Sequence, residues 1–237
     1  MTAAAAALLV ATAVSIRGPI ETAAAEFART VPGEEITLQG ASSGALVAQI
    51  EQGAPYGVFV SASASEMDRL AGAGRLVAGS RVQLATNRLV VVVRRDLQAP
   101  ARIEDLVEPR FARIAAGNPK TVPAGRYADQ ALHAAHVLPA ASDRVIYGEN
   151  AAQVLDYVAR GEADAGLVYA TDAKRAGSAI VNGPEAPPRG HDPIVYEGAA
   201  IAGAAGVDRG RAFLAFLASP AGRAILERGG FGPPPSP

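Results

Sequence analysis

The chain of 237 residues contains no cysteine and no tryptophan. The absence of cysteine excludes disulfide bonds, thiolate metal sites and cysteine nucleophiles, but it leaves the compartment open because many exported proteins also lack this residue. Aromatic residues make up only 5% of the sequence, so few aromatic side chains are available to stack on sugars or bases. The composition therefore argues against cysteine chemistry and against a stacking site.

Charge of either sign is sparse and balanced. The chain has 22 basic and 23 acidic residues, which gives a formal net charge of −1 at pH 7, and the basic residues are scattered. Without a basic cluster, neither nucleic acid nor an acidic membrane surface is an expected partner.

Long apolar runs are missing as well. The run from Ala3 to Ile16 resembles the apolar part of a secretory signal, but no Lys or Arg precedes it, and we interpret Leu8 to Val14 as a first strand. No run reaches the roughly 20 apolar residues of a membrane span, so no membrane insertion is expected. If the protein is exported, we expect its signal to have been removed or truncated here.

The residues that are present alternate between strand-like and helix-like segments, which predicts an α/β fold with mostly parallel sheets. In the first part we predict strands over Leu8–Val14, Ile36–Leu38, Tyr56–Ser61 and Arg88–Arg94. We predict helices over Pro19–Thr30 and Ser65–Ala73, and between them a helix that starts at Ser42 or Ser43 and is stopped by Gly53. The last of these strands contains LVVVV and should be fully buried.

The second half restarts the pattern. We predict helices over Ile103–Leu106, Gly125–His136, Ala151–Arg160 and Arg209–Arg228, strands over Ala112–Ala116, Arg144–Tyr147, Ala165–Tyr169 and Ile194–Ile201, a loop over Asn182–Pro193 and a disordered GPPPSP tail. The restart predicts two lobes, one formed by residues 1–84 and 194–237 and the other by 85–193. Ligands of open α/β sheets bind beyond the carboxyl ends of the strands, so we expect a ligand in the cleft between the lobes.

The segment ITLQGASSGALVAQIEQG carries the clearest site signal. Gly40 permits a tight turn after a strand, Ser42 or Ser43 is a natural N-cap, and Gly53 ends the helix. A helix start exposes N–H groups without partners and a partial positive charge, so hydroxyls placed there can extend an oxyanion site.

Three further junctions share this design of small or capping residues at a helix start. They are VSIRGP with Ser15, NPKTVPAGRYA with Pro123 and Ala124, and YGENAAQVL with Asn150 and Ala151. Tyr169, at the end of a strand, could add a phenolic donor. Such a cage would be almost neutral, and it would favour a fully ionised anion that brings no O–H of its own. Each junction taken alone is also consistent with ordinary helix capping.

At this point the sequence resembles the periplasmic molybdate-binding proteins of ABC importers. The resemblance runs from about Ser15 to Phe231 and rests on GASSGALVAQIEQGAPYGVFVSAS, NRLVVVV, GNPKTVPAGRYADQAL, YGENAAQVL, GEADAGLVYATDA and HDPIVY. It implies a two-lobed fold of the type II periplasmic-binding class and binding of free molybdate, and of tungstate, without catalysis and without a cofactor. It also implies a membrane permease as partner, a monomer and a periplasmic location. The oxyanion ligands that it implies are Ser15, Ser43, Ala124, Ala151 and Tyr169.

Some positions depart from the family pattern. Arg17 stands where the family has Thr, which could widen anion selectivity or simply form a salt bridge, and Gly57 replaces an acidic residue. Ala151 replaces Val, which matters little if only its backbone N–H is used.

Two alternatives remain open at this stage. One is another oxyanion, such as sulfate, as the ligand. The other is a serine hydrolase, because Gly40 to Gly44 also fits G-x-S-x-G with Ser42 as nucleophile and His191 as the one histidine placed to act as base. His133 and His136 lie three residues apart, but no HExxH or acidic cluster completes a cation site, so no metal cation is expected as ligand.

Overall fold

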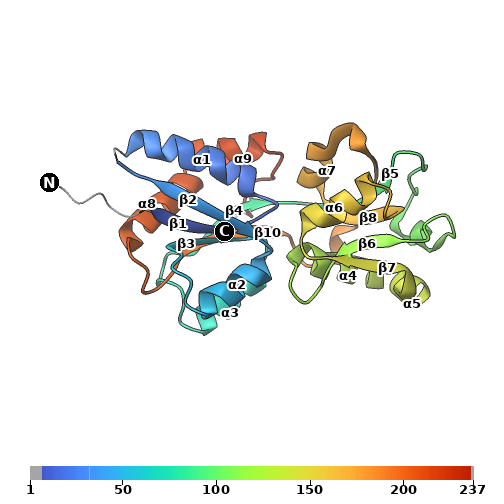
Figure 1. The fold of residues 1–237 in the computed structure, drawn as a ribbon, viewed down its shortest axis with the longest axis horizontal. Helices are drawn as coiled ribbons and strands as arrows, with labels where there is room; N and C mark the ends of the chain where they lie inside the picture. Colours follow the sequence, from blue (N-terminus) through green and yellow to red (C-terminus); the bar gives the residue numbers. More distant parts are fainter. Residues whose placement is uncertain (1–6, 32, 236–237) are drawn as a thin grey trace. The chain divides into compact units, whose positions relative to one another are not determined.

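A computed structural model describes residues 7–31 and 33–235. The described chain forms two compact units, one from the residues up to Thr86 together with those from Val195 onward, and the other from Asn87 to Ile194. The chain therefore passes between the units twice, at Thr86–Asn87 and at Ile194–Val195 (Figure 1).

The first unit is built on a five-stranded sheet with the order β2-β1-β3-β10-β4. Its strands are β1 (Leu8–Ala13), β2 (Ile36–Ala41), β3 (Val58–Ser61), β4 (Val82–Thr86) and β10 (Val195–Ala200). Strands β1, β2 and β3 are parallel, while β10 runs antiparallel to both of its neighbours, so four strands share one direction. The carboxyl ends of β1, β2 and β3 consequently meet at one edge of the sheet.

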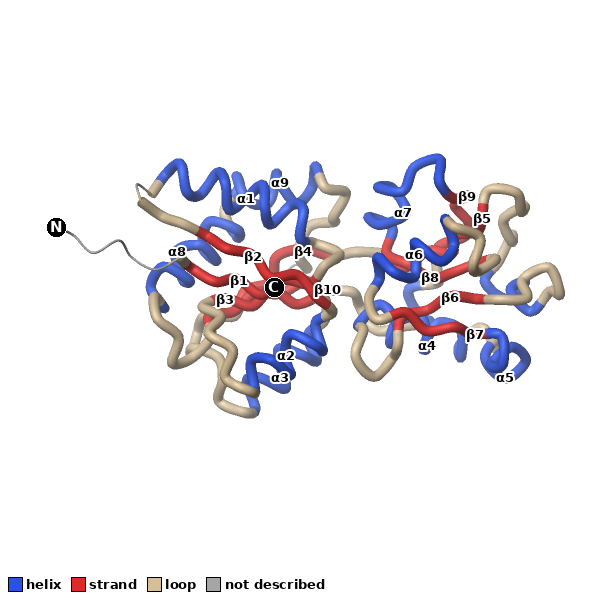
Figure 2. Tube along the Cα trace, in the orientation of Figure 1, coloured by secondary structure: helices blue, strands red, loops and turns tan. Residues whose placement is uncertain are grey.

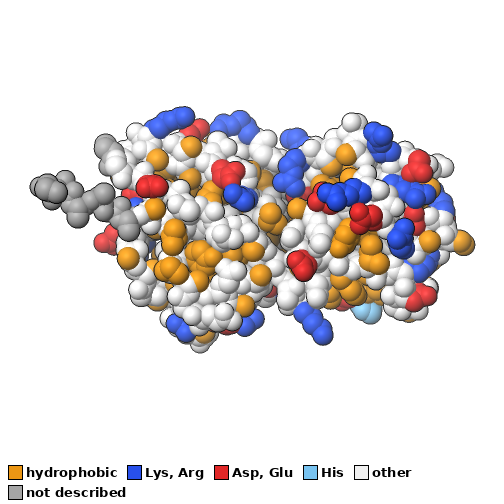
Figure 3. All heavy atoms as spheres, in the orientation of Figure 1, with side chains coloured by type: hydrophobic (Ala, Val, Ile, Leu, Met, Phe, Trp, Pro, Cys, Tyr) orange, Lys and Arg blue, Asp and Glu red, His pale blue; other side chains and the backbone are white. Residues whose placement is uncertain are grey.

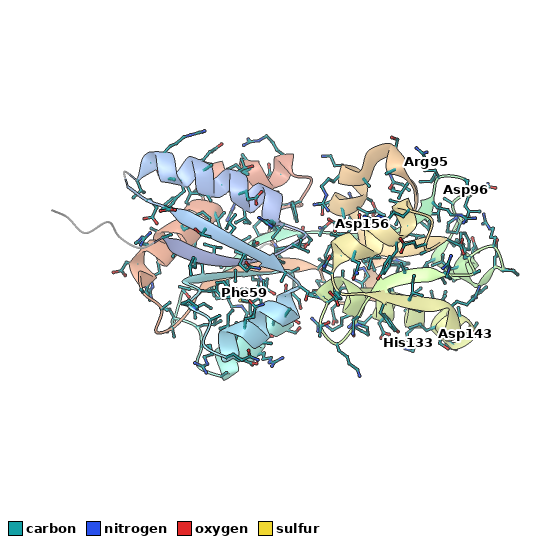
Figure 4. The ribbon with its side chains drawn as sticks, in the orientation of Figure 1. Phe59, Arg95, Asp96, His133, Asp143 and Asp156 are labelled. Atoms are coloured by element: carbon teal, nitrogen blue, oxygen red, sulfur yellow. The ribbon has the colours of Figure 1, made fainter. Side chains whose placement is uncertain are left out.

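Helices cover both faces of this sheet. They are α1 (Arg17–Thr30), α2 (Ser43–Glu51), α3 (Ala64–Gly72), α8 (Val207–Ala218) and α9 (Pro220–Arg228). In Figure 1, α1, α8 and α9 pack on one face and α2 and α3 on the other, in agreement with their contacts. Phe59 of β3 is fully buried in the core beneath α2 and α3 (Figure 4).

The second unit repeats this plan with the strand order β7-β6-β8-β5-β9. Its strands are β5 (Leu89–Arg94), β6 (Ile114–Gly117), β7 (Val145–Gly148), β8 (Ala165–Tyr169) and β9 (Ile180–Glu185). Here β6, β7 and β8 are parallel and β5 is the reversed strand. As predicted, the LVVVV part of β5 is buried throughout.

Helices again lie on both faces of this second sheet (Figure 2). They are α4 (Pro123–Ala134), α5 (Leu138–Ala141), α6 (Ala151–Ala159) and α7 (Ala170–Ala176). Helices α6 and α7 share one face, where Val154, Leu155 and Val158 of α6 pack against the sheet, and α4 covers the other face.

The reversed strand of each sheet is the strand that follows a crossing between the units. After β4 the chain enters the second unit as β5, and after β9 it returns to the first unit as β10. Each of these strands is inserted between the last two strands of its sheet. The expected two-lobed α/β fold is confirmed, with each sheet mixed in direction through this one strand.

Several details of the prediction were wrong. No strand was predicted over Val82–Thr86 and no helix over Leu138–Ala141, where the structure has β4 and α5. The predicted loop over Asn182–Pro193 contains most of β9, which pairs with β5 at the edge of its sheet. The predicted helix over Arg209–Arg228 is two helices, because Ser219 ends α8 and caps α9, and Pro220 has no N–H with which to continue α8. In the predicted disordered tail, Gly232 pairs with Thr86 in both directions of hydrogen bonding, so at least this part is ordered.

Within the part of the chain that the structure describes, none of the helices is both long and apolar enough to cross a membrane. The start of the apolar run that was compared with a secretory signal, residues 3–6, lies outside the described residues, as do the last two residues of the tail.

Candidate anion-binding site

In the first unit, Ser15 and Ser43 lie at the same edge of the sheet. The parallel register pairs Ala13 of β1 with Ala41 of β2, so each serine stands two residues beyond its paired strand end. Ser15 precedes α1, and Ser43 is the first residue of α2. Both side chains are buried, with Ser15 8% and Ser43 0% exposed.

The hydroxyl of Ser43 is fixed by the neighbouring strand end. Its Oγ accepts a hydrogen bond from the backbone N–H of Ala62, just after β3, at 3.1 Å. A serine hydroxyl can accept and donate at the same time, so this bond leaves the hydroxyl hydrogen of Ser43 to be donated elsewhere.

Ser42 is the N-cap residue of α2, but its side chain makes no capping hydrogen bond. Its backbone angles, φ −66° and ψ 147°, are those of an ordinary extended residue. A nucleophile elbow holds its serine on a sharp, strained turn, and Ser42 does not have that backbone.

The hydroxyl of Ser15 has a partner that the sequence did not reveal. Its Oγ lies 2.9 Å from the hydroxyl oxygen of Tyr196, on β10, and Tyr196 is fully buried. The two residues are 181 positions apart, so no local pattern links them. The only sequence signal was the presence of a tyrosine in the HDPIVY segment.

Arg17, the cation that the family pattern lacks, forms an ion pair within its own helix. Its Nε donates to Oε1 of Glu21 at 2.8 Å. Its stem lies over Gly40, where a Cβ atom would come within 2.9 Å of Arg17 Cδ. Of the two roles considered for Arg17, the structure supports the salt bridge.

In the second unit, Ala124 lies in the first turn of α4, which follows β6. Pro123 has no N–H, and the N–H of Arg126 bonds to the carbonyl oxygen of Val122. Helix geometry therefore leaves the N–H groups of Ala124 and Gly125 without an acceptor inside α4.

Two glycines bring this helix start onto the end of the strand. A Cβ atom on Gly125 would lie 2.1 Å from the carbonyl oxygen of Gly117, the last residue of β6. No side chain fits at Gly125 unless α4 moves away from β6. The position of the Ala124 N–H thus depends on a direct backbone contact.

Ala151 begins α6, after β7. The side chain of Asn150 caps this helix as predicted, and its oxygen accepts from the N–H of Gln153 at 3.0 Å. The N–H of Val154 bonds to the carbonyl oxygen of Asn150. Asn150 accepts hydrogen bonds from the N–H groups of Gln153 and Val154, so the N–H of Ala151 is left for another acceptor.

Tyr169 is the last residue of β8 and the N-cap residue of α7, and it is 1% exposed. The next turn is tied to the start of the second unit, because Nδ2 of Asn87 donates to Oγ1 of Thr171 at 2.9 Å. In the same turn, burial raises the pKa of Asp172 from 3.8 to about 6, and the nearby charge of Arg175 opposes this rise only in part.

The predicted residues therefore form two sets of neutral donors. Ser15 and Ser43 lie at the carboxyl edge of the first sheet, and Ala124, Ala151 and Tyr169 at the carboxyl edge of the second. In the second set, parallel strands β6 and β7 lead into α4 and α6, whose starts carry partial positive charge. Hydroxyl and amide hydrogens with helix dipoles suit an oxyanion better than a metal cation.

Other candidate chemistry is not assembled in the described residues. His133 lies on α4 with its side chain 63% exposed (Figure 4), and no group of His, Cys, Asp or Glu suited to a metal ion occurs in residues 7–31 and 33–235. His191 belongs to the second unit, where its Nδ1 is 2.7 Å from the carbonyl oxygen of Asp192. Basic and acidic side chains are interspersed on the face shown in Figure 3.

Comparisons with known proteins identify the family of the chain. Residues 8–232 match the family model described as bacterial extracellular solute-binding protein. The molybdate-binding protein ModA of Haemophilus influenzae is 32% identical over 97% of this chain and 91% of its own length. An ABC transporter substrate-binding lipoprotein of Bacillus subtilis, YvgL, is 34% identical over 84% of this chain and 76% of its own length. The solved periplasmic molybdate-binding protein of Azotobacter vinelandii superposes with a TM-score of 0.85 at 28% identity, covering 96% of this chain and all of that chain.

Proposed function

Because the chain belongs to the family of bacterial extracellular solute-binding proteins, we propose that it binds molybdate as a free oxyanion and delivers it to the membrane permease of an ABC importer. The protein makes and breaks no bond in this role. The observation that carries the proposal is that each of the two sheets presents a set of buried, neutral donors at its carboxyl edge.

In this proposal the anion takes hydrogen bonds from the side chains of Ser15 and Ser43, from the backbone N–H groups of Ala124 and Ala151, and from the hydroxyl of Tyr169. All five groups are neutral donors, and the residues are 0 to 8% exposed. Hydrogen bonds to a charged acceptor are stronger than neutral ones, so five of them can hold a dianion without a cationic side chain.

Selection by such a site rests on donor count and size. Molybdate, tungstate and sulfate carry no proton near pH 7, so each can accept from every donor, whereas hydrogen phosphate presents an O–H that the backbone N–H groups of Ala124 and Ala151 cannot accept. Tungstate is therefore the expected second ligand. Sulfate is the closest competitor, because only its smaller size distinguishes it from molybdate.

The role places the protein outside the cytoplasm, where a binding protein meets its solute before the permease does. We expect it to act as a monomer with one anion per chain.

A thermal-unfolding panel tests the proposal. Molybdate and tungstate should each raise the midpoint of unfolding at concentrations where sulfate has a smaller effect and phosphate has none, because a ligand that binds only the folded state stabilises it. Hydrolysis of a chromogenic ester in a Ser42-dependent manner, together with no response to molybdate, would replace the binding role with the hydrolase alternative.

A further inference from the structure

Tyr196 holds the hydroxyl of Ser15 in a defined place. Tyr196 is the second residue of β10 after the return to the first unit, and its hydroxyl oxygen lies 2.9 Å from Ser15 Oγ. Its ring meets the ring of Phe231 edge-on, with centroids 5.1 Å apart and planes at 88°. Tyr196 is fully buried, so its hydroxyl has little freedom to move away from Ser15.

The backbone of β10 is irregular at this residue. The pairing of β10 with β4 shifts register between Tyr196 and Glu197. Such irregularities re-aim side chains next to functional sites. Both side chains at the shift are buried, and Oε2 of Glu197 binds Nη2 of Arg81 at 2.6 Å.

The acidity of the two hydroxyls decides the direction of the bond between them. A phenol has a pKa near 10 and is a better donor than an aliphatic alcohol, which makes the serine oxygen the better acceptor. If Tyr196 donates to Ser15, the hydrogen of the Ser15 hydroxyl is directed away from Tyr196. A hydroxyl that accepts a hydrogen bond is also polarised into a stronger donor.

The hydroxyl of Ser43 also has a hydrogen-bond partner, but this partner is a backbone group. The N–H of Ala62 donates to Ser43 Oγ, so Ser43 accepts one hydrogen bond and keeps one hydrogen to give. With Tyr196 as the donor, Ser15 would be in the same state. The donor to Ser43 is a backbone N–H and can only donate. The donor to Ser15 is a hydroxyl, which makes Tyr196 the side chain on which the donor direction of Ser15 depends.

We propose that Tyr196 is a positioning residue of the oxyanion site, which donates to Ser15 Oγ and thereby commits the Ser15 hydroxyl to donate to the anion. This inference rests on the proposed function. It deepens that function by assigning part of the preference for unprotonated oxyanions to a residue that does not touch the anion.

The test is a double-mutant cycle on molybdate affinity, measured by isothermal titration calorimetry. Tyr196→Phe should weaken binding about threefold to tenfold, the worth of one neutral hydrogen bond. In the Ser15→Ala background the same change should alter affinity by less than about twofold, because the proposed effect of Tyr196 on the anion passes through the Ser15 hydroxyl. Tyr56→Phe is the matched control, since the hydroxyl of Tyr56 donates to Oε1 of Gln49 in the same unit at 2.7 Å.

The unfolding midpoints of the ligand-free variants show whether Tyr196→Phe weakens binding by freeing the Ser15 hydroxyl or by destabilising the fold. An equal loss of affinity from Tyr196→Phe with and without Ser15, or a loss no larger than that of the Tyr56 control, would overturn the proposal. If the unmodified chain does not bind molybdate, the proposed function fails and this inference fails with it. If the unmodified chain binds and the cycle shows no coupling, only the role of Tyr196 is lost.

Discussion

Replacement of Ser43 by alanine should weaken molybdate binding more than it destabilises the protein. Ser43 is 0% exposed, and alanine fills the same space without the hydroxyl, so the helix start and the local packing are retained. Two hydrogen bonds are lost: the bond accepted from the N–H of Ala62, which exists without ligand, and the proposed bond donated to the anion.

The two losses differ in size and in the state that they affect. The neutral bond from Ala62 is worth about 0.5–1.5 kcal/mol net, and its loss lowers the free energy of unfolding of the ligand-free protein. The bond to a charged anion is worth about 1.5–3 kcal/mol, and its loss raises the dissociation constant roughly 10- to 150-fold.

Calorimetric titration gives the dissociation constant, and urea denaturation of the ligand-free protein gives the stability. Ser42→Ala is the control, because the side chain of Ser42 makes no capping bond and it is not assigned to the anion. We expect its dissociation constant to stay within about threefold of the unmodified value, less than the worth of one hydrogen bond to an anion. A larger loss of affinity from Ser42→Ala than from Ser43→Ala would refute this reasoning.

Three further predictions follow from contacts elsewhere. Gly125→Ala should lower molybdate affinity at least about tenfold in calorimetry, because the new Cβ forces α4 away from Gly117, whereas Gly72→Ala, with nothing within 4 Å of its added Cβ, should leave affinity unchanged. Since burial raises the folded-state pKa of Asp172 to about 6, its contribution to stability is present below about pH 4 and is lost as pH rises through 6. Asp172→Asn should remove this loss, so that urea denaturation shows the variant gaining on the order of 2–3 kcal/mol relative to the unmodified protein between pH 4 and pH 8, and an unchanged difference would contradict the assignment. Arg17→Gln should change molybdate affinity less than about twofold at low salt, since its charge is paired within α1 and exposed ion pairs contribute little; a tenfold loss would make Arg17 part of the site.

Much of the fold was predictable because its elements carry strong local patterns. The strand Ala165–Tyr169 was predicted with its observed bounds, and Pro123 and Asn150 mark helix starts through chemistry that the sequence displays directly. The reversed strands were not predictable in this way, because strand direction depends on where the chain crosses between units.

The missed elements have identifiable physical reasons. Strand β9 contains Asn182, Gly183 and Pro184, which are typical of a loop, yet proline is tolerated at the edge of a sheet. The break between α8 and α9 did have a local signal, since a serine followed by proline both ends one helix and starts the next.

The places of the proposed donor groups in the fold were predictable to the extent that they depend on local sequence. Ser43, Ala124 and Ala151 lie at helix starts that small residues and capping residues indicate in the sequence. The partners that fix these donors were not predictable, because the contacts of Ser43 with Ala62 and of Ser15 with Tyr196 join different strands. Only the folded sheet brings such residues together.

The most direct test of the central claim is a crystal structure of the protein grown with molybdate, with anomalous diffraction recorded at the molybdenum edge. The account predicts one strong molybdenum peak per chain. The anion's oxygen atoms should lie about 2.7–3.1 Å from the hydroxyl oxygens of Ser15, Ser43 and Tyr169 and from the backbone nitrogens of Ala124 and Ala151. A peak beside Arg17 and away from these donors would contradict the account. So would the absence of a peak in crystals grown with molybdate in large excess over the protein.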